Sequence, residues 1–444
     1  MNTKNSKYIS QVSEYAFIAY FFILTFFPYG ADVIKVMCLM TMVGCLAYQM
    51  VLEKRIIFEK TALNIPILVF FIYLIIASIF SKNTKYCFET LLHDYVPYFI
   101  IFFCMVNTIH SIEQVKRIIK AMLIICGLVC GYGLYGYYTG IAVRDDRLIA
   151  TFKYHSRIAK YISLFLPIAI CLFFYYRSIF VRFWLGCLVF VSGYAIVLTM
   201  SRASWFANMV AVIYIAFMLK KKYLLIAIIV LCPLLLVLLP SKYSMHAKTI
   251  TQYDKFFSSN KILGERLMCW KASIAIILDH PLLGIGPGKR NFRDIYETYR
   301  KEIREKEKKS LGDTPAKTVK KKKSVKPKKA QKVEGLSHAH NIILHMWVET
   351  GIFGLAIFLW MFTIIFYRTI KTIKSIAENR FEKMLLVGVS AGLVSLISHG
   401  LTDIFWKTPE SLFLWQVIGV LFLIIQLEGN RKRKDILSSY SGNS

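Results

Sequence analysis

A histidine and an asparagine stand directly before a long apolar run, at a spacing that suits acid–base chemistry. His340 and Asn341 are followed after nine residues by Gly351 and then by Gly354, and His338 stands two positions earlier. A neutral imidazole, whose ordinary pKa is about 6.5, can take a proton from a sugar hydroxyl at neutral pH. Glycines three apart in a membrane helix permit close helix packing, which would hold the start of the helix rigidly. The alternative is an ordinary surface histidine in a loop.

Two arginines sit where an anion could be bound at the edge of a membrane. Arg202 follows the apolar run AIVLTMS, and Arg266 lies four residues before Trp270 on one face of an amphipathic segment. A charged side chain at a bilayer centre costs at least about 2.5–3.5 kcal/mol, so it usually has a partner or a function. Two planar guanidinium groups in one pocket would suit a diphosphate. The alternatives are an Arg202 that snorkels to the interface and an Arg266 that anchors to lipid phosphate.

The composition describes the chain that must position these residues. Of its 444 residues, 56% are hydrophobic and 18% are charged, whereas globular chains are typically about 25% charged. A soluble enzyme, a disordered tail protein and a secreted disulfide scaffold are therefore excluded. The net charge of +30 would suit nucleic acid, but multi-pass membrane proteins also accumulate Lys and Arg. The Lys320–Lys323 run has no interleaved aromatic residues, so we expect no nucleic-acid partner.

Apolar windows predict an all-α polytopic membrane protein, since about 20 apolar residues cross a bilayer as a helix. We expect about twelve helices, at 13–29, 31–50, 62–80, 92–109, 117–139, 158–176, 178–200, 203–219, 223–239, 342–367, 384–402 and 410–428.

Basic residues in the short loops predict the orientation. With the N-terminus inside, the inner loops collect most of the Lys and Arg, as the positive-inside rule requires, and both termini are cytoplasmic. Residues 1–239 then hold helices 1 to 9, and residues 240–341 form a large outer loop between helices 9 and 10. Residues 342–428 hold helices 10 to 12, and residues 429–444 form a basic inner tail.

The outer loop divides by composition. Residues 262–279 predict an amphipathic helix at the interface, and residues 300–333 are a Lys-rich, aromatic-poor run that we expect to be disordered. Gly284 to Lys289 resembles a phosphate loop, but Arg290 replaces the Ser/Thr and no strand precedes it. Cys87 and Cys269 are the two cysteines expected outside, and whether they pair is open. No spacing indicates a metal site.

The same residues carry a family resemblance. His340-Asn341-x9-Gly351-x-x-Gly354 resembles the signature of the O-antigen ligase and polymerase superfamily. Three further segments resemble landmarks of that family in the same order: MSRASW at 200–205, Arg266-x3-Trp270, and DHPLLGIGPG at 279–288.

The resemblance implies a metal-independent, inverting glycosyltransferase of the membrane-embedded GT-C type, with no cofactor. Such an enzyme moves a glycan from undecaprenyl diphosphate to an acceptor sugar at the periplasmic face of the bacterial inner membrane. His340 would be the base, and Arg202 and Arg266 would hold the diphosphate. Asp403 resembles a family acidic residue that orients the histidine. Supporting roles fall to Asn341, His338, Gly351 and Gly354.

Three functions are compatible with these residues. We favour an O-antigen ligase, whose acceptor is a lipid A core sugar. A polymerase of the same superfamily cleaves the same donor bond and is the nearest alternative. A multi-pass transporter or lipid flippase is an alternative from another class, although its charged residues would be expected near the membrane midplane rather than at the outer rim.

Overall fold

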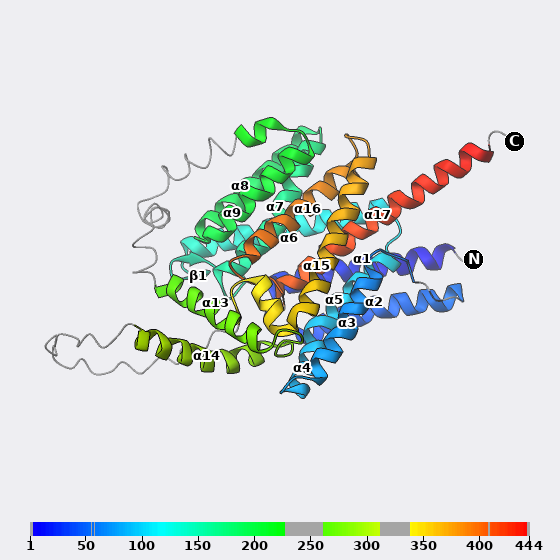
Figure 1. Cartoon of the computed structure of the whole chain (residues 1–444). Coiled ribbons are helices and arrows are strands. Elements are labelled where there is room, and N and C mark those ends of the chain that lie inside the picture. Colours follow the sequence, from blue (N-terminus) through cyan, green and yellow to red (C-terminus); the bar gives the residue numbers. More distant parts are fainter. Residues whose placement is uncertain are drawn as a thin grey trace.

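The computed structural model describes residues 3–54, 56, 58–226, 261–310, 338–406 and 409–441, and nearly all of them are helical (Figure 1). In chain order the helices are α1 (Thr3–Phe26), α2 (Asp32–Glu53), α3 (Asn64–Ile79), α4 (Thr84–Thr90), the π-helical turn η1 (Leu91–Tyr95), α5 (Val96–Thr108), α6 (Ile112–Tyr138), α7 (His155–Tyr175), α8 (Ile179–Leu198), α9 (Arg202–Met218), α13 (Lys261–Asp279), α14 (Lys289–Ser310), α15 (Ile342–Ser375), α16 (Phe381–Gly400) and α17 (Pro409–Ser441).

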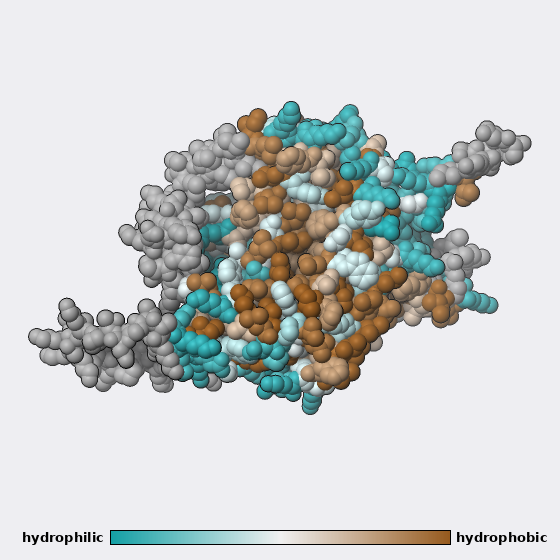
Figure 2. All heavy atoms as spheres, viewed as in Figure 1, coloured by the Kyte–Doolittle hydropathy of each residue, from teal (hydrophilic) through white to brown (hydrophobic). Residues whose placement is uncertain are grey.

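The prediction of an all-α polytopic membrane protein is confirmed. Among the described residues, nine helices are long and apolar enough to cross a membrane, and α3 and α9 are shorter apolar helices. An apolar band crosses the visible face of the molecule, with hydrophilic residues gathered at its upper edge (Figure 2). The expected ninth span, 223–239, lies largely outside the described residues, so the count of twelve stays a prediction.

The helices form a bundle whose two ends differ. The start of α1 and the end of α17 emerge on the same side in Figure 1. Helices α13 and α14 lie together outside the bundle, at the end where α15 begins (Figure 1). Arg266 lies on α13 and His340 directly precedes α15, so these two residues belong to the end of the bundle that carries α13 and α14.

The centre of the bundle depends on a close approach of α7 and α16. A Cβ at Gly388 of α16 would lie 2.8 Å from Ile168 Cα of α7, and one at Gly392 would overlap the Leu164 carbonyl. Small residues four apart allow two membrane helices to pack backbone to backbone. This contact runs antiparallel, so the first turns of α7 lie beside the end of α16.

The Lys-rich segment starts as a helix, which corrects the expectation of disorder from residue 300. Helix α14 continues to Ser310 because its apolar side chains recur at helical spacing and pack against α13. A Lys271–Glu307 ion pair of 2.7 Å also joins the two helices. Residues 311–333 of the Lys-rich run lie outside the described residues.

A short hairpin closes the loop between α6 and α7. Strand β1 (Val143–Arg144) pairs antiparallel with β2 (Arg147–Leu148), and Val143 is opposite Leu148. Asp145 and Asp146 between them have φ of 52° and 60°, which fits a two-residue turn of the type that matches strand twist. The hairpin presents Arg147 near the start of α7, and sequence patterns did not predict it.

Candidate active site

Two histidines lie in the segment that enters α15. His340 has a φ of 50°, in the left-handed region that few non-glycine residues adopt. Asn341 is the N-cap of α15, and its side-chain oxygen accepts from Ile343 N and Leu344 N. Its amide nitrogen donates to Leu401 O at 3.1 Å. Asn341 thus ties the start of α15 to the loop after α16.

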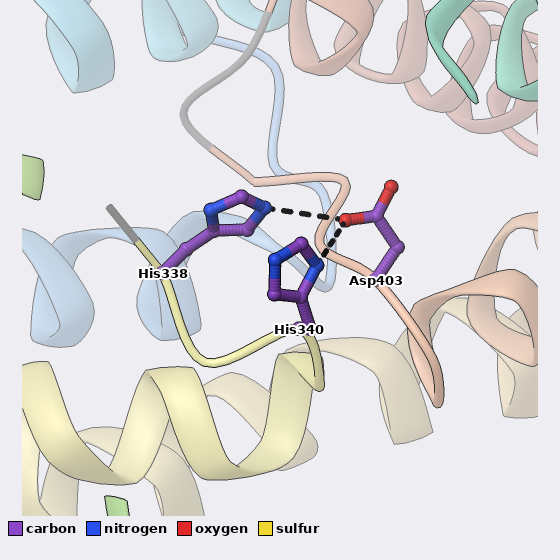
Figure 3. Close-up of side chains that lie close together, drawn as sticks. All are labelled: His338, His340 and Asp403. Carbon is purple, nitrogen blue, oxygen red and sulfur yellow. Dashed lines mark hydrogen bonds and ion pairs between the residues drawn. The ribbon is translucent and has the colours of Figure 1, made fainter. Parts of the chain in front are cut away.

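Asp403, in that loop, joins the two histidines. His338 Nε2 lies 3.3 Å from Asp403 Oδ1 in a hydrogen bond, and His340 Nδ1 lies 3.5 Å from the same oxygen, as an ion-pair contact without hydrogen-bond alignment (Figure 3). The imidazole rings of His338 and His340 are 4.2 Å apart, centroid to centroid. With Nδ1 facing Asp403, His340 Nε2 points away from the carboxylate. Asp403 and His340 are therefore in contact, and the orienting role of Asp403 stays a prediction.

The other carboxylate oxygen of Asp403 is held by a lysine. Lys160 Nζ, on α7, lies 3.3 Å from Asp403 Oδ2 and donates to Ile404 O at 2.7 Å. The Lys160 side chain is 3% exposed. Removing one partner of such a buried pair typically costs about 3–5 kcal/mol, because the other charge is left uncompensated. Lys160 and Asp403 therefore stabilise the site as a unit.

The charges around Asp403 set its protonation. Burial by itself raises the pKa of Asp403, but the Lys160 ammonium and the nearby imidazoles of both histidines outweigh it and hold the pKa well below its usual range. Burial lowers the pKa of His338 to about 4, against the opposing effect of its hydrogen bond to Asp403. At neutral pH the cluster thus contains a carboxylate and a neutral His338.

Lys160 was missed at the sequence level. It lies inside the window 158–176, where every neighbouring residue from Ile158 to Ile162 is apolar or aromatic. An ionisable residue within a membrane span is a functional candidate by default. That rule alone would have singled out Lys160, but only the structure identifies Asp403 as its partner.

The arginines gather near the same end of α7. Arg202 is the first residue of α9, and it interacts electrostatically with Arg266 of α13 and with Arg147 of the hairpin. Arg147 Nη1 lies 2.9 Å from His155 Nε2, and the charges of Arg266 and Asp403 both act on His155. Like charges brought together repel one another, so the arrangement favours an anion that would relieve the repulsion. Arg202 thus lies within electrostatic range of both Arg266 and Arg147, and a diphosphate site shared by Arg202 and Arg266 stays a prediction.

Gly351 was expected to pack helix against helix, but it forms a kink in α15. It has a φ of 64° and kinks α15, and a Cβ there would overlap the Leu282 carbonyl. The segment 280–288 docks on the kink: Ile285 N donates to Val348 O at 2.9 Å, and Gly286 N donates to Glu349 O at 3.0 Å. These hydrogen bonds pair backbone carbonyls that lose their helical partners at the kink. Inside a membrane every backbone polar group has to be paired within the protein.

Gly354 does allow helix packing. A Cβ at this position would lie 2.8 Å from a ring carbon of Tyr73 on α3. The Tyr73 hydroxyl lies 2.6 Å from Thr350 O, one more carbonyl at the kink. The prediction of two glycines packing helix on helix is therefore wrong for Gly351, because the contact there is with a loop.

The two outer cysteines are both free. Cys87 Sγ accepts from Asn291 Nδ2 at 3.1 Å, and Cys269 Sγ lies 3.4 Å from His338 O. Each sulfur thus has its own neighbour, and the open question of a disulfide between them is answered against it in this structure.

Comparison with known proteins confirms the family resemblance. Residues 187–359 match the family model described as O-Antigen ligase. The chain therefore carries an O-antigen ligase superfamily domain. No curated protein matches the chain. Members of this superfamily are glycosyltransferase-like ligases, and the match supports a function of the ligase or polymerase type for this chain.

The O-antigen ligase segment holds only part of the site. Arg202, Arg266 and His340 lie within residues 187–359, whereas Lys160 and Asp403 lie outside them, on α7 and after α16. The site is thus completed by helices on both sides of the matched segment.

The neutral state of His338 predicts a pH-dependent stability. The unfolded chain protonates His338 at about pH 6.5, and the folded site only at about pH 4. The stabilising contribution is therefore fully present above pH 6.5, and up to roughly 3 kcal/mol is lost as the pH falls to 4. We expect His338→Gln to flatten the decline of the melting temperature of purified protein between pH 6.5 and 4. The matched variant His93→Gln, at an exposed position, should keep the wild-type slope, and equal slopes for all three proteins would contradict the prediction.

Proposed function

We propose that this chain is an O-antigen ligase of the bacterial inner membrane. It would move a glycan from undecaprenyl diphosphate to a lipid A core sugar, with inversion at the anomeric carbon, without a metal or other cofactor, and with a GT-C type fold. The observation that carries the proposal is the group of His340, Asp403 and Lys160, which lies near the arginine cluster of Arg202 and Arg266.

The histidine supplies the base in this proposal. His340 Nε2 accepts the proton of the acceptor hydroxyl as its oxygen attacks the anomeric carbon of the donor. Asp403 Oδ1, 3.5 Å from His340 Nδ1, stabilises the imidazolium that forms. The 3.5 Å contact shortens when substrate closes the site, as catalytic hydrogen bonds commonly do. Lys160 keeps Asp403 ionised for this purpose.

The arginines stabilise the leaving group. As the bond between the anomeric carbon and the phosphate oxygen breaks, its electron pair goes to the diphosphate, whose negative charge increases. Guanidinium groups placed where that charge develops lower the barrier, and each such group is commonly worth about 10²–10³-fold in rate. Arg202 and Arg266 have this role, and Arg147 adds to the positive field.

The location follows from charge in the loops. The inner loops collect Lys and Arg, which assigns both termini to the cytoplasm and the residues 240–341 to the periplasm. His340, Arg266 and Asp403 then lie on the periplasmic side. Membrane lipids surround the apolar band of the bundle (Figure 2).

A polymerase of the same superfamily is the second candidate, because both enzymes cleave the same donor bond. A transporter is disfavoured, since Lys160 and Asp403 meet at one end of the bundle and serve the histidines there. Substrate flux in proteoliposomes that survives His340→Ala would support transport.

A deletion strain separates ligase from polymerase. We expect loss of this chain to strand full-length polymer on the lipid carrier, because a ligase acts after chain extension. The readout is gel and mass analysis of the carrier-linked and core-linked glycan fractions. Single repeat units attached to core in the deletion strain would identify a polymerase instead.

Replacement of the base should stop transfer. We expect His340→Ala to lower the rate of glycan transfer by about 10²–10⁴-fold, the usual value of a general base, at unchanged membrane abundance. The measurement is transfer by purified enzyme from a diphosphate-linked donor. His93→Ala is the matched control and should transfer at the wild-type rate. Wild-type transfer by His340→Ala would refute the role of the histidine.

Replacement of the arginines should affect the chemical step. Arg202→Ala and Arg266→Ala should each lower kcat by about 10²–10³-fold. Lysine at either position should recover only part of the loss, because it keeps the charge and lacks the bidentate fork. Arg293→Ala, at a 52% exposed arginine of α14, is the control. Undiminished kcat in both alanine variants would remove the diphosphate role.

A further inference from the structure

Three side chains of the site form a set of possible metal ligands, a use that the proposed reaction does not make of them. His338 Nε2, His340 Nδ1 and Asp403 Oδ1 all lie within 4.8 Å of one another (Figure 3). The two histidine nitrogens are 3.3 and 3.5 Å from the carboxylate oxygen. His340 Nδ1 is buried and has no hydrogen-bond partner among the described residues. An unpartnered ring nitrogen is thus aimed at the same point as a second imidazole and a carboxylate.

The spacing is that of ligands around zinc. Zinc–nitrogen and zinc–oxygen bonds of about 2.0–2.2 Å in a tetrahedron place neighbouring ligand atoms about 3.3–3.5 Å apart. Both contacts to Asp403 Oδ1 already have this length, and the two histidine nitrogens, which lie within 4.8 Å of each other, are the pair that a zinc ion would have to draw to this spacing. Three protein ligands leave a fourth position for water, which is the arrangement of an open zinc site.

The surroundings select among metals. Lys160 pairs with Asp403 Oδ2, so one carboxylate oxygen and two imidazole nitrogens remain as ligands for a metal. Mg²⁺ and Ca²⁺ require six or more oxygen ligands, whereas imidazole suits zinc. The Lys160 ammonium also raises the positive potential at His338, which weakens the binding of ions held by charge alone.

We propose that His338, His340 and Asp403 form an inhibitory Zn²⁺ site that competes with catalysis. Zinc on Nδ1 requires that nitrogen to be unprotonated, so the single proton of the neutral imidazole stays on Nε2. An Nε2 that already carries a proton cannot accept one from the acceptor hydroxyl. Zinc on Asp403 Oδ1 also removes the group that would stabilise the imidazolium. The binding of zinc stands independently of the function proposed above, and its inhibitory effect rests on that function.

The binding experiment uses the purified full chain in detergent with Zn²⁺ alone. We expect one zinc per chain by titration calorimetry and by metal analysis after dialysis, and no displacement by a hundredfold excess of Mg²⁺. His338→Asn and His340→Asn should each weaken binding at least tenfold, whereas the control His93→Asn should bind as the wild type does. X-ray absorption should report nitrogen and oxygen neighbours at about 2.0–2.2 Å without sulfur from the adjacent Cys269.

Equal zinc affinity in the wild type and both site variants would overturn the proposal. Unchanged melting temperatures in the absence of zinc show that the variants are folded, and Cys269→Ala, which should still bind zinc, separates this site from a thiol site.

The activity experiment tests the inhibition separately. Zn²⁺ should abolish glycan transfer by the wild type, a chelator should restore it, and whatever transfer His338→Asn retains should require at least tenfold more zinc for half-inhibition. Zinc that binds at this cluster without slowing transfer would overturn the inhibitory role. An enzyme that transfers no glycan in any form would count against the proposed function alone, since the binding result is obtained without turnover.

Discussion

The buried pair of Lys160 and Asp403 is the interaction on which the rest of the site depends. The residues are 243 positions apart, and they meet because α7 and α16 approach backbone to backbone at Gly388 and Gly392. An ionised carboxylate inside a protein is costly unless it is paired and hydrogen-bonded, and Lys160 provides the pairing. His338 is hydrogen-bonded to this carboxylate and His340 lies 3.5 Å from it, so both imidazoles lie against a charge that the lysine stabilises.

The segment that carries the histidines is held from two further directions. Asn341 caps α15 and reaches the backbone of the loop that bears Asp403. Below it, the kink at Gly351 receives the segment 280–288, which supplies the backbone donors that the broken helix lacks. A left-handed His340 is tolerated because these contacts fix the chain on both sides of it. The left-handed residue thus lies where the proposed mechanism needs a fixed direction for the imidazole.

Charge at the site is divided between two tasks. Lys160 is committed to Asp403 and maintains the protonation of the cluster. Arg147, Arg202 and Arg266 repel one another and so suit a polyanion that would neutralise them. The net charge of +30, which first suggested nucleic acid, is spread over the chain, and the part that concerns the proposed chemistry is these few residues. The proposed zinc site uses the two imidazoles and the Asp403 carboxylate, and none of the arginines.

The sequence by itself determined the features that depend on local composition and chemistry. Apolar windows locate membrane helices because a span must bury its own backbone polarity, and the types of His340, Arg202 and Arg266 limit what they can do. Tertiary structure decided which of these side chains meet. Lys160 and Asp403, the docking at Gly351, and the helical start of the Lys-rich run all depend on contacts between distant segments, and periodicity along one chain carries no information about them. A charge inside a span indicates that a partner exists, and only the packing of α7 against α16 determines that the partner is Asp403.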